Sequence, residues 1–489
     1  MTTKQNYKPM PGQEDKVRLF LDDPLLATVE DNVFKQAANT ACTCGVEHVA
    51  ILPDTHSGYG APIGSVVVSS DRVIPGPVGY DIGCGMALYL TNVPATTLKD
   101  HMLRRRVMDA IDRGIAMGEG RSATHDVDTN RPFVEAVLNR GAHALHERGW
   151  IPEGWVDRCE RAVHAIPENP NGAVKHFELS EVPQRAHRGF SQLGTLGGGN
   201  HFIELQEIKL PKDEALRAIA QMWGLWDGQL AIMVHSGSRG FGHALGEWAF
   251  QTFQAYNDKH GETYADKELV HAPVTSKEAK QYMRYVAAGA NFALANRLLM
   301  ARVVKQSVES VLPKAGVSLL YEISHNLAQW EPDENGDLKL VHRKGTTRAF
   351  PAGHSMLKGT MWESTGHPVI TPGSMGTYSA IQVGLPGAAA SFYSINHGAG
   401  RVMSRAAARK TLDQGKVDAE MAAMDILVNH RHTPLDEAPA VYKNMDDVLR
   451  AVQACDLAAV VAKAYPIGSM KGSDEPKGSH GKHFGKKRR

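Results

Sequence analysis

The chain has little of what marks several common protein classes. Its 489 residues contain only five cysteines at irregular spacing, too few for a disulfide framework, so we expect a reducing, cytoplasmic compartment. The N-terminal residues lack the apolar core of a signal peptide, and no uncharged apolar run approaches the length of a membrane span. A net charge of +1 excludes a protein that attracts nucleic acid through its overall charge.

Other signatures are missing as well. No Gly-Lys-Ser/Thr follows a glycine run at the spacing of a Walker loop. Aromatic residues make up 7% of the chain and form no recognisable RNA-binding motif. Positive charge is concentrated in residues 473–489, which hold six basic and two acidic side chains. This composition predicts a disordered, solvated tail, with a weak RNA-affinity arm as the less common alternative.

The hydrophobic pattern predicts an α+β fold with a β-rich core flanked by long helices. β-branched or alternating runs that end at Pro, Gly or Asp predict strands at 46–52, 64–69, 86–91, 230–234, 318–323, 338–342 and 380–383. Apolar residues at three- and four-residue spacing predict helices at 98–117, 131–148, 212–222, 244–258, 276–311 and 445–464. No low-complexity linker divides the body, so we expect one catalytic domain over residues 1–472 and a tail over 473–489.

Polar residues of metal-binding type stand in glycine-rich or small-residue segments that are far apart in the chain. Asp81 and Cys84 share the turn 79–85, whereas His201, His235 and His325 each follow a glycine turn or end a predicted strand. Each alone is more often a core or capping residue. Together, imidazole, carboxylate and thiolate groups favour a transition metal such as Mn, Zn, Fe or Co, and a thiolate is able to bridge two cations.

Glycine runs with free backbone amides suit phosphate groups. The candidates are residues 194–200, 372–377 and 398–401. Arg239, Arg348 and Arg401 lie nearby as bidentate phosphate ligands or as surface ion-pair partners, which is the commoner role, and their adjacency to the glycine segments favours the phosphate role. His397 lies in an open setting between Asn396 and Gly398. The residues alone leave it as a metal ligand, a base or a nucleophile.

Assembled in this order, the segments resemble the RtcB family of RNA ligases from about residue 52 to residue 471. The matching blocks are 52–60, the Asp81/Cys84 turn, 194–201, 235–240, 324–326, 343–348, 372–377 and 397–401. The resemblance implies a single catalytic domain with a deep active-site cleft. It also implies an enzyme that joins an RNA 3′-phosphate or 2′,3′-cyclic phosphate to a 5′-hydroxyl, with GTP and Mn²⁺, in tRNA splicing or RNA repair.

By the same resemblance His397 is the nucleophile that becomes guanylylated, and Arg239 meets an RNA or nucleotide phosphate. Two Mn²⁺ ions would be held by Asp81, Cys84, His201, His235 and His325. The implied nucleotide contacts are Asn200, His201, Phe202, Ile203, Glu204, His325, Asn326, Pro372, Gly373, Ser374, Met375, Ser379, His397, Gly398, Ala399, Gly400, Tyr442 and Lys471. Lys477, which also precedes a glycine, offers an alternative alignment to Lys471.

The implied partners are RNA ends, such as tRNA halves or cleaved RNA, and an archease-like activator, with no membrane. Two alternatives remain at this point. A dimetal cyclic phosphodiesterase or phosphatase would use the same ligands without guanylylation. A non-catalytic RNA-binding protein would leave the predicted ligand set without a purpose.

Overall fold

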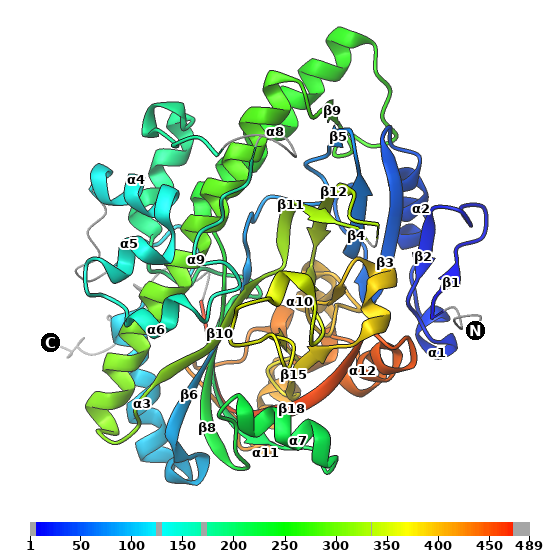
Figure 1. Ribbon diagram of the computed structural model, residues 1–489. Coiled ribbons are helices and arrows are strands. Elements are labelled where there is room, and N and C mark those ends of the chain that lie inside the picture. Colours follow the sequence, from blue (N-terminus) through cyan, green and yellow to red (C-terminus); the bar gives the residue numbers. More distant parts are fainter. Residues whose placement is uncertain (1–5, 124–129, 168–173, 334, 473–489) are drawn as a thin grey trace, which may run out of the picture.

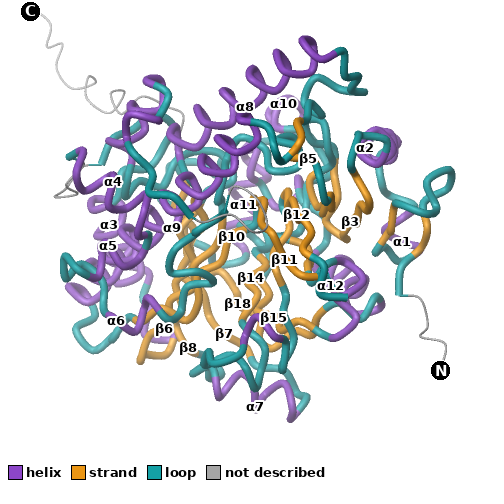
Figure 2. Tube along the Cα trace, turned by 45° about the horizontal axis from the view of Figure 1, so that its top comes forward, coloured by secondary structure: helices purple, strands orange, loops and turns teal. Residues whose placement is uncertain are grey.

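The structure, a computed structural model, describes residues 6–123, 130–167, 174–333 and 335–472 (Figure 1). The predicted tail at 473–489 lies outside the described residues, and so does Lys477. The described part is an α+β fold in which two sheets occupy the centre. Figure 2 shows the strands gathered there, with α3, α4, α5, α6 and α9 on one side of them.

The larger sheet is 8-stranded and mixed, because β17 pairs with β18 in parallel and the other pairs are antiparallel. Its strand order is β10-β6-β8-β7-β18-β15-β14. In that order the strands are Ser318–Ser324, Gly85–Pro94, Gln229–Ser236, Phe202–Lys209, Ala458–Lys471, Ser379–Gly384 and Pro368–Thr371, with β17 at Leu427–Val428.

A second, 6-stranded sheet has the order β1-β2-β3-β4-β12-β11. These strands are Lys8–Pro9, Val17–Leu19, Val46–His56, Ile63–Ser69, Leu338–Lys344 and Asn326–Pro332. Two short ribbons complete the β-structure of the described residues: β13 (Thr346–Arg348) with β16 (Ser394–Asn396), and β5 (Arg72–Val73) with β9 (Ala272–Pro273). β11 follows β10 after one residue, His325, so the two sheets meet there.

The longest helix, α9 (Lys277–Val311), begins where the Ser276 side chain accepts a hydrogen bond from the Ala279 amide. Gly289 faces Ile82, and a β-carbon there would come within 3.0 Å of the Ile82 side chain. The other α-helices are α1 Asp23–Leu26, α2 Asp31–Ala41, α3 His101–Gly114, α4 Arg131–Arg140, α5 Ala142–His146, α6 Glu153–Val156, α7 Glu214–Met222, α8 Arg239–His260, α10 Arg405–Thr411, α11 Gln414–Ala423 and α12 Met445–Ala454. No helix in the described ranges has the length and apolarity to cross a bilayer.

One predicted helix is wrong and another is broken. The helix expected over 445–464 ends at Ala454, and residues 458–471 form β18 instead. Asp456 adopts φ +53°, a left-handed conformation that stops the helix, and Pro466 within the following strand is incompatible with a helix interior. Gly141, at φ +49°, divides the helix expected over 131–148 into α4 and α5.

Candidate functional site

The predicted metal ligands come together because their strands are neighbours in the larger sheet. Cys84 directly precedes β6, His201 directly precedes β7, His235 lies near the end of β8 and His325 follows β10. The order β10-β6-β8-β7 and a register that pairs Gly85 with Ser236 and Ser324 place these residues at the same end of the sheet. Asp81 joins them through the turn before Cys84.

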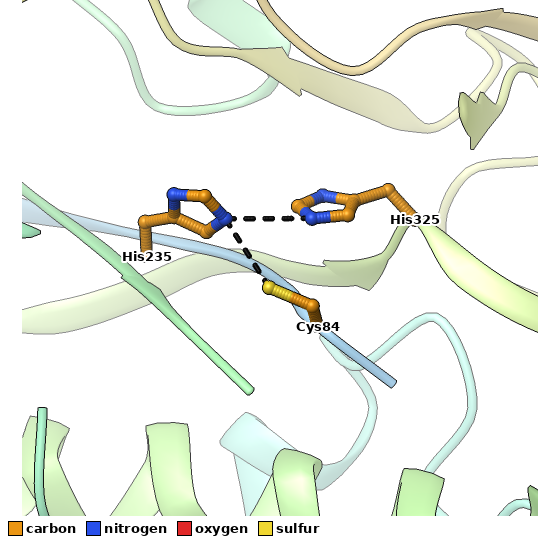
Figure 3. A group of neighbouring side chains, drawn as sticks. All are labelled: Cys84, His235 and His325. Carbon is orange, nitrogen blue, oxygen red and sulfur yellow. Dashed lines mark hydrogen bonds between the residues drawn. The ribbon is translucent and has the colours of Figure 1, made fainter. Parts of the chain in front are cut away.

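The donor atoms lie within contact distance of one another. The Cys84 Sγ is 3.4 Å from His235 Nε2 and 3.5 Å from His201 Nε2, and the two Nε2 atoms of His235 and His325 are 3.4 Å apart. Figure 3 shows Cys84, His235 and His325 pointing toward a common point. Asp81 Oδ2 lies 3.2 Å from His201 Nε2. Two overlapping groups result, Cys84/His235/His325 and Asp81/Cys84/His201, whose donor atoms lie within 4.8 Å of one another.

The buried imidazoles of His235 and His325 are in the neutral form that can bind a metal ion. Burial is the main cause that lowers the pKa values of His235 and His325 well below the ordinary range, so both rings are neutral. The backbone carbonyl of Asn200 lies 3.2 Å from His235 Nδ1 and accepts its proton, which leaves the Nε2 lone pair free. His201 Nδ1 faces the Leu196 carbonyl at 3.0 Å in the same way. The Nε2 lone pairs of His235 and His201 therefore face Cys84, as ligand atoms do in a metal site.

The thiol and the carboxylate complete this donor set. Burial and the Asp81 charge raise the pKa of Cys84 well above its ordinary value, so a thiolate there requires a compensating cation. Burial raises the pKa of Asp81, but the neighbouring His201, Arg239 and Cys84 together outweigh it and hold that pKa below its usual range. The Ser238 amide donates to Asp81 Oδ1 at 3.0 Å and fixes the carboxylate. These residues fit a divalent transition metal.

His397 follows β16 and lies beside this cluster, with its ring centroid 4.9 Å from that of His325. Its Nδ1 is 2.7 Å from Oδ2 of Asp54, a fully buried residue of β3. Because a carboxylate only accepts, Nδ1 carries the proton and Nε2 keeps its lone pair. The same Asp54 oxygen accepts the backbone amides of His397 and Gly398 at 3.2 and 3.3 Å. Gly345 leaves space for the His397 ring, since a β-carbon at position 345 would lie 2.9 Å from Nδ1.

A cavity of about 280 Å³ opens in front of His397 and His235. Of the predicted nucleotide contacts, those that line it are Asn200, Phe202, Glu204, Pro372, Gly373, Ser374, Met375, His397, Gly398, Ala399, Gly400, Tyr442 and Lys471. The others lie outside its lining. Ile203 and Ser379 are buried behind the wall, and the Ser379 hydroxyl accepts the Gly373 amide at 3.2 Å.

Asn326 also lies outside the lining and connects two parts of the site. Its side-chain amide donates to the Asp81 carbonyl at 3.2 Å, and its side-chain oxygen accepts the Gly345 amide at 2.8 Å. It therefore joins the turn that carries Asp81 and Cys84 to the glycine that makes room for His397. His201 and His325 belong to the donor cluster itself.

One wall of the cavity, around Glu437, is densely charged. Glu437 is almost fully buried and accepts from the Tyr442 hydroxyl at 2.6 Å, from Lys471 Nζ at 2.9 Å and from Arg401 at 3.2 Å. Arg405 lies 3.5 Å from the same carboxylate. On the adjoining wall, burial raises the pKa of Glu204 to about 7 against the opposing charge of Lys471. Such a lining suits a polar, anionic ligand.

The three arginines predicted at phosphates have different surroundings. Arg401 lines the cavity, and Arg239 lies over the glycine loop, with its Nε donating to Thr195 Oγ1 at 3.2 Å. Arg348 does not face the cavity. It is buried in ion pairs with Glu160 and Glu331, so the phosphate role proposed for it is wrong, because these carboxylates already occupy its guanidinium.

Sequence reasoning missed four residues of the site. Asp54 and His56 lie in the block 52–60, Arg405 follows Arg401 by four positions, and Glu437 precedes Tyr442 by five. Only the tertiary structure gives these residues their place, since Asp54 contacts a histidine 343 positions away. The matching block 52–60, which contains Asp54 and His56, was the available signal for these two residues.

Comparison with known proteins shows the family of the chain. The family model described as tRNA-splicing ligase RtcB matches residues 36–472. The tRNA-splicing ligase RtcB of Aeropyrum pernix is 36% identical over 471 residues, which cover 93% of this chain and 94% of that protein. The corresponding protein of Thermococcus kodakarensis is 35% identical with the same coverage. The RNA-splicing ligase RtcB of Mycobacterium tuberculosis is 35% identical over 451 residues, 89% of this chain and 100% of that protein. The chain therefore belongs to the RtcB family of RNA ligases.

Proposed function

We propose that this protein is a GTP-dependent RNA ligase that joins a 3′-phosphate or 2′,3′-cyclic phosphate end to a 5′-hydroxyl end. The observation that carries the proposal is the position of His397, held by Asp54 between the donor cluster and the cavity. A hydrolase needs the cluster alone, whereas a nucleophilic imidazole with an oriented Nδ1–H suits covalent transfer. The family and the names of the relatives support the RNA-ligase activity.

In the first step, the Nε2 lone pair of His397 attacks the α-phosphorus of GTP. A nitrogen–phosphorus bond forms, the bond to the β-phosphate oxygen breaks and pyrophosphate leaves. Asp54 stabilises the positive charge that develops on the ring. Because the same imidazole first accepts the guanylyl group and then gives it up, one difficult displacement is divided into easier ones.

In the following steps, an oxygen of the RNA 3′-phosphate attacks the guanylyl phosphorus and His397 leaves, which gives an RNA end activated as a diphosphate with GMP. The 5′-hydroxyl of the second RNA then attacks the 3′-phosphorus, loses its proton and displaces GMP. A cyclic phosphate end is first opened by water to the 3′-phosphate. Activation is needed because the oxygens of an unmodified 3′-phosphate repel the incoming alcohol and none is a good leaving group.

Cys84, His235 and His325 would hold one Mn²⁺ ion, and Asp81, Cys84 and His201 a second. Bound there, the metal supplies Lewis acidity and charge neutralisation at the phosphoryl oxygens. The chain itself contributes orientation. The backbone around Gly398 and Gly400 lines the cavity in front of the ring, and Gly400 approaches Asp54 so closely that a β-carbon would meet its carbonyl at 2.1 Å.

We assign guanine recognition to Glu204 and to the adjoining charged wall. An ionised Glu204 accepts the N1 and N2 hydrogens of guanine, which adenine does not offer, while Lys471 and Tyr442 contact the same base or its ribose. Arg239, beside the Asp81 side of the cluster, would receive an RNA or nucleotide phosphate. The physiological setting we propose is tRNA splicing or the repair of cleaved RNA in the cytoplasm, with an archease-like activator as a candidate partner.

The test is covalent labelling. The full chain, incubated with Mn²⁺ and GTP labelled at the α-phosphate, should retain the label through denaturation. His397→Ala should retain none, yet still bind Mn²⁺ and join RNA ends that already carry the guanylyl group. ATP and individual metals serve as controls. Opening of cyclic phosphates by the wild-type protein without any labelling would favour the hydrolase instead.

A further inference from the structure

Two adjacent buried polar residues interrupt the most apolar stretch of α9. Asn296 and Arg297 are both fully buried, whereas their neighbours Ala295, Leu298 and Leu299 belong to the main hydrophobic core. A buried charge and a buried amide are costly unless every donor finds a partner. Their partners therefore indicate why they are there.

The partners of Arg297 are the three segments that carry Cys84, His235 and His325. One nitrogen, Nη1, donates to the carbonyl of Gly83 at 2.8 Å and to the carbonyl of Ser236 at 2.7 Å. The other, Nη2, donates to Ser324 Oγ at 3.2 Å and pairs with Glu322. Gly83, Ser236 and Ser324 each adjoin one of the predicted metal ligands in the sequence. Glu322 lies three residues before His325. A single planar guanidinium thus fixes the backbone beside all three donors.

Asn296 holds the remaining segments. Its side-chain oxygen accepts the amides of Gly194 and Thr195 at 2.7 and 3.0 Å. Its side-chain amide donates to the carbonyls of Thr195 and Gly237, each at 3.1 Å. These contacts tie the glycine loop that leads to His201 to the turn after β8, which supplies the backbone amide that holds Asp81.

We propose that Asn296 and Arg297 are positioning residues that set the geometry of the metal-ligand cluster from the helix side. Arg297 orders Cys84, His235 and His325 relative to one another, and Asn296 orders the segments of Asp81 and His201. The donors in Figure 3 are thus held so that they point toward one another. This inference rests on the proposed metal site and is independent of guanylyl transfer.

The contrasting interpretation is a buried ion pair between Arg297 and Glu322 that stabilises the fold and has no special relation to the metal. Arg104 provides the matched control, because it has the same pattern of contacts away from the cluster. It is 3% exposed, its Nη1 donates to the carbonyls of Asp425 and Ile467, and its Nη2 pairs with the Asp425 carboxylate. Substitution of lysine for arginine at either position keeps the positive charge but removes the planar guanidinium and its several hydrogen-bond donors.

The experiment compares Arg297→Lys, Arg104→Lys and the wild-type full chain. Mn²⁺ affinity is measured by the electron paramagnetic resonance of free Mn²⁺, and donor geometry by the thiolate-to-metal charge-transfer band of the Co²⁺ form. Arg297→Lys should weaken Mn²⁺ binding by about 10- to 100-fold, the usual effect of losing a group that orients ligands, and should change the Co²⁺ band. Arg104→Lys should leave both unchanged, although it also loses thermal stability.

Wild-type Mn²⁺ affinity and an unaltered Co²⁺ band in folded Arg297→Lys would overturn the inference. If that variant does not fold, Asn296→Ala decides, with an expected loss of about 10-fold in Mn²⁺ affinity and wild-type affinity as the contradicting result. A wild-type protein that binds no Mn²⁺ would refute the metal site itself. Normal Mn²⁺ binding without guanylylation would refute only the proposed catalytic step.

Discussion

The donor cluster and the charged wall of the cavity are both buried and polar, but they satisfy their polar groups in different ways. In the cluster, backbone carbonyls accept the Nδ1 protons of His235 and His201 and leave their Nε2 lone pairs directed at Cys84. In the wall, charged side chains pair with one another around Glu437. The cluster therefore consists of side chains that can bind a cation but includes no cationic side chain. The wall, in contrast, contains both acidic and basic side chains.

This difference predicts different responses to substitution. A change in the cluster removes donors that nothing nearby replaces, so its effect should be nearly complete. A change in the wall leaves other charges able to rearrange, so its effect should be graded. His397 lies between the two regions and is oriented by Asp54, which belongs to neither.

The largest effect is expected from Cys84→Ala, because its sulfur is shared by both donor groups. Metal binding at both should fall below detection, and ligation should drop by more than about 10³-fold. Metal content after dialysis and a ligation assay check this. Retention of one tightly bound Mn²⁺ per chain would show that the thiolate is not shared.

An intermediate effect is expected from Asp54→Asn. The amide would donate toward Nδ1 and favour the tautomer with a proton on Nε2, which removes the lone pair that attacks GTP. Guanylylation should slow by about 10²- to 10⁴-fold, as measured by the rate of label incorporation. Mn²⁺ affinity should stay at the wild-type value, and a parallel loss of metal would contradict the separation of the two roles.

The smallest effect is a pH dependence of GTP binding through Glu204, whose pKa burial raises to about 7. The carboxylate that accepts the guanine hydrogens is mostly protonated at pH 6 and mostly ionised at pH 8. GTP affinity should therefore rise by about tenfold between these values, in proportion to the ionised fraction. Equilibrium binding to the full chain measures it.

The control for this effect is Glu204→Gln, which should bind GTP more weakly at pH 8 and show a flat profile over the same interval. ATP should show no comparable rise in either protein, because adenine lacks the N1 and N2 hydrogens. An equal pH dependence in wild type and Glu204→Gln would assign the titration to another group.

The five cluster residues could be recognised in the sequence because each lies at the end of a strand or in a glycine turn, and such positions converge at a sheet end. Their distances could not, since the order β10-β6-β8-β7 joins strands that are distant in the chain. The site's charged partners were hidden for the same reason. Glu437 and Asp54 become functional only through contacts made by folding, and Arg348 was misassigned because Glu160 and Glu331 are remote in sequence.

The fold was predictable where local preference and packing agree, as in the helix from 277 to 311. It was not predictable at 458–471, where apolar residues at helical spacing form β18 between β7 and β15. The edge-to-edge pairing with two strands outweighs the weak helical preference of this segment. Lys471, the last residue of β18, lines the cavity.

The last described residue, Gly472, covers the hydrogen bond between the Gly118 amide and the Gly197 carbonyl so closely that a β-carbon would lie 2.2 Å from that carbonyl and 2.4 Å from that amide. Position 472 therefore has no space for a side chain. The substitution Gly472→Ala would push the glycine loop away from Gly118 and shift Asn200 and His201 with it. The contact at Gly472 thus helps to hold in place the glycine loop that precedes His201.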